Sequence, residues 1–242
     1  MARAGQIAGE VLEKVAAAAK PGVSTLDLDR MAEQLIRAAG GEPGFKKVTG
    51  YYHTICTSPN EDVVHGIPTG RVLKDGDILS IDLGAYFQGF HSDTAVTVPI
   101  GEVPQPVQQF IATGRQALYE GIAQAKVGSK TGDISAAIEK VLRGGNYAIV
   151  ESLTGHGVGR KLHEEPLVPN LGQARTGVPL EEGLVIAIEP IYTNGSPDVD
   201  LKDDGWTISS SHATLAAQFE HTIAITADGP KILTQRPSEI VP

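Results

Sequence analysis

Apolar residues recur at helical spacing in two stretches of the chain. Over 5–19, and again over 111–125, they stand three and four positions apart. After each stretch come a Gly turn, a Ser/Thr or Asp helix-start signal and a further run of helical spacing. The pattern therefore predicts two pairs of helices, one at the start of the chain and one after its middle.

A different pattern follows each predicted helix pair. KDGDILSIDLG (74–84) and EEGLVIAIEPI (181–191) share an acidic residue, a Gly, an apolar run, an Ile and a carboxylate. A turn followed by a β-branched run is typical of a buried strand. The next predicted strands, in SDTAVTV and FEHTIAIT, also begin beside a carboxylate. The sequence thus predicts four strands that carry Asp82, Asp93, Glu189 and Glu220.

The two helix–strand units repeat one another. Residues 19–40 align with 125–146 at a constant offset of 106, and Asp82 aligns with Glu189 at an offset of 107. Pro and Gly gather between the units, at 99–106. We interpret the chain as a single domain, 1–242, built from two similar α+β halves, about 1–103 and 104–242, that share one sheet.

Composition and charge narrow the classes of function. The net charge of −9 argues against nucleic acid as the main partner, because phosphate contacts require clustered Lys and Arg. No apolar run approaches the roughly 18 residues of a membrane-spanning helix. Cys56 is the only cysteine, so the chain can form no internal disulfide, which suits a reducing compartment. We expect a cytoplasmic protein, a monomer, with no membrane partner.

The carboxylates in these apolar strands call for a cation. If the hairpin is symmetric about Phe87–Gln88, Asp82 lies directly opposite Asp93, with Cβ atoms roughly 5 Å apart. Two like charges at that distance in an apolar sheet repel strongly unless one is protonated or a cation lies between them. Glu189 and Glu220 repeat the problem. One buried acid is commonly structural, but four together predict a metal site.

His156 adds a nitrogen ligand to these four acids. Gly155, Gly157 and Gly159 surround it, and we expect them to let the backbone approach a bound ion or substrate. Four carboxylates and one imidazole suit a pair of divalent ions better than a closed structural zinc site. Such a pair polarises a carbonyl and activates a water, so the predicted reaction class is hydrolysis.

The same segments resemble a known family, the type I methionine aminopeptidases. The resemblance rests on NEDVVHGIP (60–68), DILSIDLGAYFQGFHSDTA (77–95), GHGVGRKLHEEP (155–166), LVIAIEPIY (184–192) and DGWTISSSHATLAAQFEHTI (204–223). It implies the α+β pita-bread fold, a pseudo-twofold pair of halves sharing a curved, mostly antiparallel sheet with helices on its outer face. It also implies a dinuclear aminopeptidase that removes the N-terminal methionine from peptides and nascent polypeptides and prefers a small second residue.

Roles for individual residues follow from the resemblance. It implies metal ligation by Asp82, Asp93, His156, Glu189 and Glu220, with Asp93 and Glu220 bridging the ions. It also makes Glu189 the acceptor of a proton from the attacking water, places His65 at the substrate amine and puts His163 on the scissile carbonyl. The other four histidines, His53, His91, His212 and His221, we expect to be structural.

The resemblance further implies an apolar methionine pocket. Its walls would include Tyr51, Cys56 and Trp206, with His65 at the edge. The sequence has Leu162 where many members of the family carry Phe, so one aromatic wall is expected to be missing. A nucleophilic role for Cys56 is a weaker interpretation, because a lone cysteine in an apolar stretch is usually buried and inert.

Several alternatives stay open at this point. Xaa-Pro aminopeptidases and proline dipeptidases share the fold and the five ligands, although DGWT and AQFEHTI favour the methionine branch. A metal-free binding module with this fold is a second alternative, which the complete ligand set disfavours. Cobalt, manganese, iron and zinc all tolerate such ligands. Nothing in the sequence constrains a transient ribosome contact.

Overall fold

Four helices form in two pairs, as the apolar spacing predicts. The computed structural model describes residues 1–241, and its helices are α1 (Ala2–Ala18), α2 (Thr25–Ala38), α3 (Gln105–Gln124) and α4 (Thr131–Gly144). Side chains close the starts of the second helix of each pair: the Ser24 hydroxyl accepts from the Asp27 N–H at 3.2 Å, and the Asp133 carboxylate accepts from the Lys130 N–H at 2.8 Å. In residues 1–241, none of the helices combines the length and apolarity that crossing a membrane requires.

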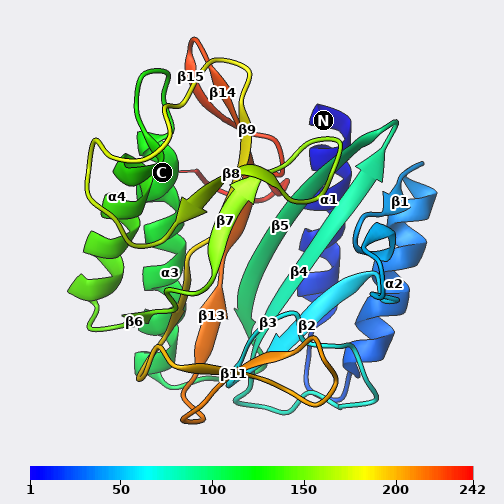
Figure 1. Ribbon diagram of the computed structural model, residues 1–242. Helices are drawn as coiled ribbons and strands as arrows, with labels where there is room; N and C mark the ends of the chain where they lie inside the picture. Colours follow the sequence, from blue (N-terminus) through cyan, green and yellow to red (C-terminus); the bar gives the residue numbers. More distant parts are fainter. Residues whose placement is uncertain (242) are drawn as a thin grey trace.

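A nine-stranded antiparallel sheet forms the centre of the molecule (Figure 1). Its strands run β1-β4-β5-β14-β9-β7-β8, with β15 on β14 and β2 on β4. Their bounds are β1 Glu42–Pro43, β2 Ile55–Pro59, β4 Ile78–Phe87, β5 Phe90–Pro99, β7 Thr154–Gly157, β8 Glu164–Pro169, β9 Val185–Ile188, β14 Glu220–Thr226 and β15 Gly229–Ile232.

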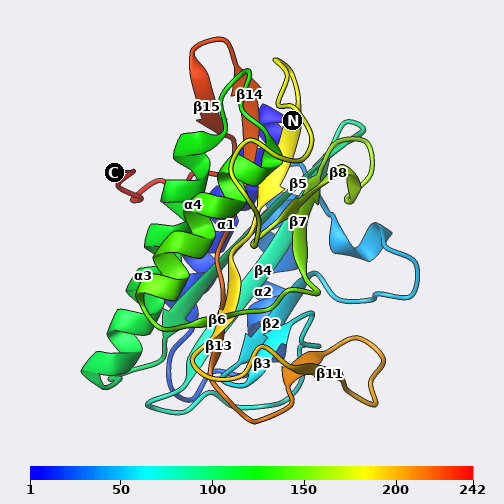
Figure 2. The same cartoon turned by 60° about the vertical axis from the view of Figure 1, so that its left-hand side comes forward.

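Two small sheets and a short helix complete the fold. One sheet joins β6 (Ala148–Ile149), β10 (Ile191–Thr193) and β13 (Ala216–Gln218), and the other joins β3 (Asp62–Val64), β11 (Val199–Leu201) and β12 (Ile208–Ser210). The 3-10 helix η1 spans Phe45–Lys47. The four long helices cover the outer face of the curved sheet (Figures 1 and 2). This is the pita-bread fold that the resemblance implies.

The sheet is continuous across the middle of the chain because β5 pairs with β14. That seam is narrow, with Ala95 opposite Glu220 and Thr94 opposite His221. A separate apolar core lies on each side of it: α1 and α2 pack on β4, and α3 and α4 pack near β9 and β14. The single-domain assignment and a boundary near residue 103 stay predictions.

The register of the β4–β5 hairpin differs from the predicted one. Gln88 (φ 48°) and Gly89 (φ 91°) form the turn, and positive φ at both central residues is typical of the type I′ turn that joins tight hairpins. Asp82 therefore lies opposite Ala95, and Asp93 lies opposite Gly84. The prediction that the two acids oppose each other directly is wrong. The shift is two residues, however, so both side chains remain on one face as diagonal neighbours.

Candidate metal centre and substrate pocket

The five predicted ligands converge on one cavity from five different segments. Asp82 comes from β4, Asp93 from β5, His156 from β7, Glu189 from the residue after β9, and Glu220 from the start of β14. Ligand atoms within 4.8 Å of one another form three groups: Asp82–Asp93–Glu220, His156–Glu189–Glu220 and Asp93–His156–His163. Glu220 belongs to both of the first two groups, and Asp93 to the first and third. The side chains are thus close enough to surround two ions with shared ligands.

Burial makes these carboxylates costly without a cation. Within residues 1–241, Asp82 Oδ1 and Glu220 Oε1 are buried and have no hydrogen-bond partner. A buried polar atom without a partner costs about 1–3 kcal/mol, and more when it is charged. Burial and then repulsion from neighbouring carboxylates raise the pKa of Asp82, Glu189 and Glu220 well above the usual values. A divalent cation would satisfy the unpaired oxygens, so this donor set fits the predicted metal.

Asp93 and His156 have complementary protonation states for binding metal. Burial raises the pKa of Asp93 to about 7, whereas burial lowers that of His156 to about 4. The His156 Nδ1–H donates to the Gly157 carbonyl at 2.8 Å, so Nε2 carries the lone pair. That nitrogen lies 3.8 Å from Asp93 Oδ2 and 3.6 Å from Glu189 Oε1. A neutral imidazole oriented in this way is typical of a metal ligand.

The glycines beside His156 let strand β7 lie close to its neighbours. A Cβ at Gly155 would lie 2.4 Å from the Ala187 carbonyl oxygen, and one at Gly157 would lie 2.2 Å from that of Glu165. These close approaches are to the neighbouring strands β9 and β8, and approach to an ion or substrate stays a prediction. These glycines let β7 pack against its neighbours and so fix the position of His156.

Three polar residues that the sequence pattern did not single out hold the ligands. The Gln218 amide donates to Glu189 Oε2 at 3.2 Å, and the Asn170 amide donates to the Glu189 carbonyl at 2.9 Å. Thr222 Oγ1 accepts from the Asp93 N–H at 2.9 Å and donates to its carbonyl at 2.8 Å. Gln218 and Thr222 stand two positions before and after Glu220, a period-two signal that could have identified them.

Apolar side chains line the other half of the cavity. Phe45, Tyr51, Cys56 and Leu162 form a buried cluster against which Val48, Ile67 and Trp206 pack. The ring of Tyr51 meets that of Trp206 edge to face at 5.0 Å, and its hydroxyl donates to the Ile55 carbonyl at 2.7 Å. The cavity volume of about 90 Å³ leaves room for several waters or one side chain. Tyr51, Cys56 and Trp206 thus line the same cavity as the five predicted ligands.

Burial governs the chemistry of the remaining cavity side chains. It lowers the pKa of His65 to about 4, with a further contribution from His163, and it lowers the pKa of His163. Both imidazoles are therefore neutral at pH 7 and can donate or accept a proton. Burial raises the pKa of the Cys56 thiol, so a nucleophilic thiolate is disfavoured. His53, His91, His212 and His221 do not line this cavity.

Comparisons with known proteins agree with this geometry. Metallopeptidase family M24 matches residues 1–227. Methionine aminopeptidase 1 of Bacillus subtilis is 42% identical over 235 residues, which cover 97% of this chain and 95% of the relative. Methionine aminopeptidase of Clostridium perfringens is 41% identical, and the match covers 97% of this chain and 94% of that relative.

Solved structures resemble this chain to different degrees. The crystal structure of methionine aminopeptidase from Thermotoga maritima superposes with a TM-score of 0.95 at 38% identity, covering 98% of this chain and 95% of that chain. Prolidase from Pyrococcus furiosus has a TM-score of 0.77 at 22% identity and covers 97% of this chain but only 62% of that chain. The latter likeness is one of fold alone.

Proposed function

We propose that the chain, which belongs to metallopeptidase family M24, removes the N-terminal methionine of peptides and nascent polypeptides through a pair of divalent ions. Its nearly full-length relatives are methionine aminopeptidases. It is a metallo-exopeptidase by family. The observation that supports two ions, rather than one, is that Glu220 belongs to two separate groups of potential ligands.

Each ion would be held by carboxylates from both halves of the sheet. Asp82 would serve one ion and His156 and Glu189 the other, with Asp93 and Glu220 bridging them. When bound, two such ions polarise the scissile carbonyl and lower the pKa of the attacking water. Manganese, iron, cobalt and zinc all remain candidates for this oxygen-rich ligand set.

The side chains of the protein would supply proton transfer and orientation. Glu189 would accept a proton from the attacking water; the Gln218 amide orients its carboxylate. His163, neutral at pH 7, would donate a hydrogen bond to the scissile carbonyl and stabilise the charge that develops there. His65, at the edge of the apolar half, would pass a proton to the new amine.

Selectivity for methionine would arise in the apolar half of the cavity. Tyr51, Cys56 and Trp206 offer aromatic edges and a soft sulfur, which a thioether contacts favourably. Because the metal ligands line the same small cavity, a bound methionine would leave the second residue beside them. The preference for a small second residue stays a prediction.

Two rival functions have less support. Prolidase and Xaa-Pro dipeptidase structures share the fold at about 22% identity, whereas methionine aminopeptidases match at about 40% over almost the whole chain. A binding module that lost its metals would not be expected to keep four buried carboxylates at this cost. The cytoplasmic location, the monomeric state and any ribosome contact stay predictions.

A peptide panel combined with metal analysis tests the proposal. The protein, stripped with a chelator and reloaded with Mn²⁺, Fe²⁺, Co²⁺ or Zn²⁺, is expected to bind two ions per chain and to cleave Met-Ala-Ser but not Ala-Pro peptides. Peptides with a bulky second residue should be poor substrates. Binding of two metals without cleavage of any peptide would support the binding module instead, and cleavage of Ala-Pro would support the proline-specific branch.

A further inference from the structure

The wall of the cavity that carries Trp206 is part of a separate small hairpin. Strands β11 and β12 pair with each other, and β12 joins β3 through Ile208–Val64 and Ser209–Asp62, with an irregular register between these two pairs. Strand β11 is the outer strand of that three-stranded sheet. The hairpin that carries Trp206 is therefore joined to the rest of the sheet by main-chain hydrogen bonds to β3, a strand of only three residues.

The loop of this hairpin is internally well ordered. The Asp204 carboxylate accepts from the N–H groups of Trp206 at 2.9 Å and Thr207 at 2.8 Å, and from the Thr207 hydroxyl at 2.5 Å. The Lys202 N–H donates to the Thr207 carbonyl at 2.8 Å. Trp206 is thus fixed relative to its own hairpin, and its position in the pocket depends on how the hairpin is attached to the rest of the protein.

Besides the β12–β3 ladder, one ion pair attaches the hairpin to the rest of the protein. Lys202 Nζ lies 2.5 Å from Asp62 Oδ1, and among residues 1–241 no other ion pair joins the hairpin to the rest of the chain. The Asp62 side chain is only 10% exposed, whereas that of Lys202 is 44% exposed. Removing Lys202 would leave a nearly buried carboxylate without its counter-charge, which costs far more than the loss of a pair at the surface. Opening the hairpin would hydrate that carboxylate.

The ion pair of Lys202 and Asp62 also lies close in sequence to His65, which lines another wall of the pocket. Asp62 begins β3, and His65 follows directly after this strand in a left-handed conformation with φ 58°. The Ile67 N–H donates to the Thr207 hydroxyl at 3.4 Å, so the segment after His65 is tied to the same loop. Movement of the hairpin relative to β3 would therefore displace both Trp206 and His65.

We propose that Lys202 and Asp62 are positioning residues that fasten the β11–β12 hairpin over the methionine pocket and thereby set its affinity for the substrate side chain. The inference rests on the proposed methionine specificity of this cavity. Neither residue touches the cavity itself. Both act through Trp206 and His65, so they should affect binding of the side chain more than the chemical step.

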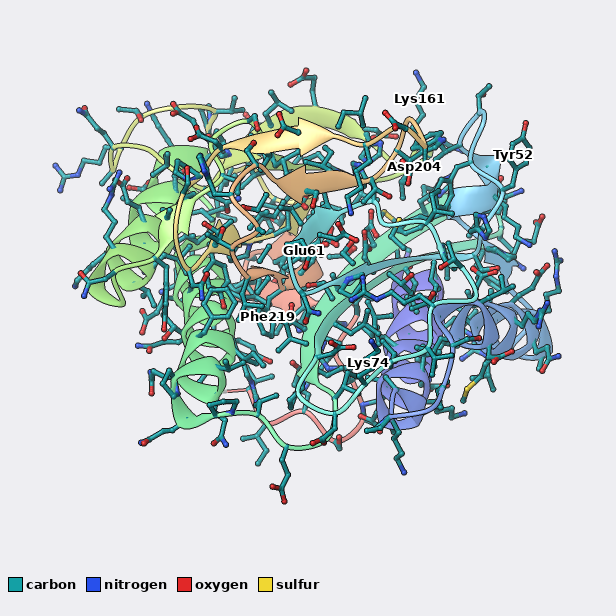
Figure 3. All side chains as sticks on the ribbon, turned by 90° about the horizontal axis from the view of Figure 1, so that it is seen from below. Tyr52, Glu61, Lys74, Lys161, Asp204 and Phe219 are labelled. Carbon is teal, nitrogen blue, oxygen red and sulfur yellow. The ribbon has the colours of Figure 1, made fainter. Side chains whose placement is uncertain are left out.

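The only tryptophan in the sequence reports on the hairpin directly. The test compares wild type with Lys202→Met, Lys202→Arg, Asp62→Asn and the double variant Asp62→Asn/Lys202→Met. Lys74→Met is the matched control, because Lys74 is exposed and lies well away from Asp204 on the hairpin loop (Figure 3). For each metal-loaded protein, Trp206 emission, its quenching by acrylamide, the melting temperature, and KM and kcat for Met-Ala-Ser are measured.

Lys202→Met is expected to shift Trp206 emission to longer wavelength, to increase quenching, and to raise KM about five- to tenfold with kcat changed less than about twofold. Lys202→Arg should restore wild-type values. The double variant leaves no unpaired charge, so it should lie between Lys202→Met and wild type, and it carries the test if Lys202→Met does not fold.

Two results would overturn the proposal. One is Trp206 emission and KM in Lys202→Met that equal those of Lys74→Met. The other is a fall in melting temperature with unchanged emission and KM, which marks a purely structural pair. If wild type cleaves no methionyl peptide, the proposed function fails, but emission and quenching still decide whether the ion pair fastens the hairpin.

Discussion

The hydroxyl of Thr222 forms hydrogen bonds with both main-chain groups of Asp93. It accepts from the N–H at 2.9 Å and donates to the carbonyl at 2.8 Å. The pairing of β5 with β14 ends one residue earlier, at Thr94 and His221, so this side chain takes the place of the next ladder bonds. The backbone of Asp93, one predicted bridging ligand, is thus fixed by a residue two positions from the other, Glu220.

Thr222→Val should therefore weaken metal binding. Valine keeps the shape but leaves a buried N–H and a buried carbonyl unpaired, which costs about 1–3 kcal/mol of unfolding free energy. Metal affinity is expected to fall about 10- to 100-fold, as for other changes behind a ligand. Calorimetric titration with Mn²⁺ measures this, and Thr222→Ser, which keeps the hydroxyl, is the control. Equal affinity in both variants would contradict the role of the hydroxyl.

Asp93→Asn should abolish activity and weaken metal binding, because it removes an anionic oxygen shared by two groups of ligands. In the metal-free protein at pH 8 the same change should raise the melting temperature, since it replaces a buried, ionised carboxylate beside three other buried acids with a neutral amide. Turnover and calorimetry with and without a chelator test both effects. Wild-type turnover in this variant would refute the assignment of Asp93 as a ligand.

His163→Ala should lower kcat more than it raises KM. Its contact with the scissile carbonyl strengthens as charge develops, so the loss is expected to be about 100- to 1,000-fold in kcat. Steady-state kinetics with Met-Ala-Ser give both constants. His212→Ala serves as the control, because His212 is exposed and does not line the cavity. Equal changes in kcat and KM would indicate simple substrate binding.

The stabilisation by metal should grow as the pH rises. Burial raises the pKa of Asp93 to about 7 in the folded, metal-free protein, so the folded state holds a proton that the unfolded state has lost. The stabilisation that the protonated Asp93 carboxyl contributes is fully present below about pH 4 and is lost as the pH rises through 7. The buried His65 and His156 have the opposite sign, but only below about pH 6.5.

Between pH 6.5 and 8.5, therefore, the melting temperature of the metal-free protein should fall while that of the metal-loaded protein changes little. Metal binding also displaces protons from the carboxyls, so apparent affinity should drop as the pH falls through about 7. Differential scanning calorimetry with and without Mn²⁺ measures the difference between the two melting temperatures. A difference independent of pH over this range would show that the carboxylates are not the metal site.

Gly114→Ala should destabilise the protein although it lies within α3. In an open helix the change to Ala adds about 0.5–1 kcal/mol of stability. Here the new Cβ would lie 2.3 Å from the Tyr192 hydroxyl oxygen, so a loss of about 1–3 kcal/mol is expected from overpacking. Gly144→Ala in α4, which meets no atom within 4 Å, is the control. Urea denaturation of both variants measures the two free energies.

The sequence makes four acids candidate ligands because carboxylates are conspicuous in apolar strands, and the structure brings them to one cavity with His156. It predicted the helix pairs for a similar reason, since apolar spacing and start signals are local. It failed at the β4–β5 register because Gln88 is not a residue that typically adopts positive φ, so the turn was placed one position too early. Asp82 and Asp93 still lie on the same face of the sheet, because side chains alternate with a period of two and the register differs by two residues.

The polar residues behind the ligands could not be predicted in the same way. Gln218, Asn170 and Thr222 matter only through contacts that the folded chain creates, such as the one between Thr222 and Asp93, 129 positions apart. The pair of Lys202 and Asp62 spans 140 positions. Hydrogen bonds of this range depend on how the sheets are placed, and no local pattern encodes them.

The narrow seam between β5 and β14 has a consequence for the integrity of the chain. Asp82 and Asp93 precede the seam in sequence, whereas His156, Glu189 and Glu220 follow it. A nick between Pro99 and Gln105 would leave neither fragment with a full set of ligands, and the main-chain ladders that join the fragments are short: two residue pairs between β5 and β14, and two between β12 and β3. Divalent ions bound by ligands of both fragments would then add to their association, so a cleaved protein should dissociate more readily when a chelator removes the ions.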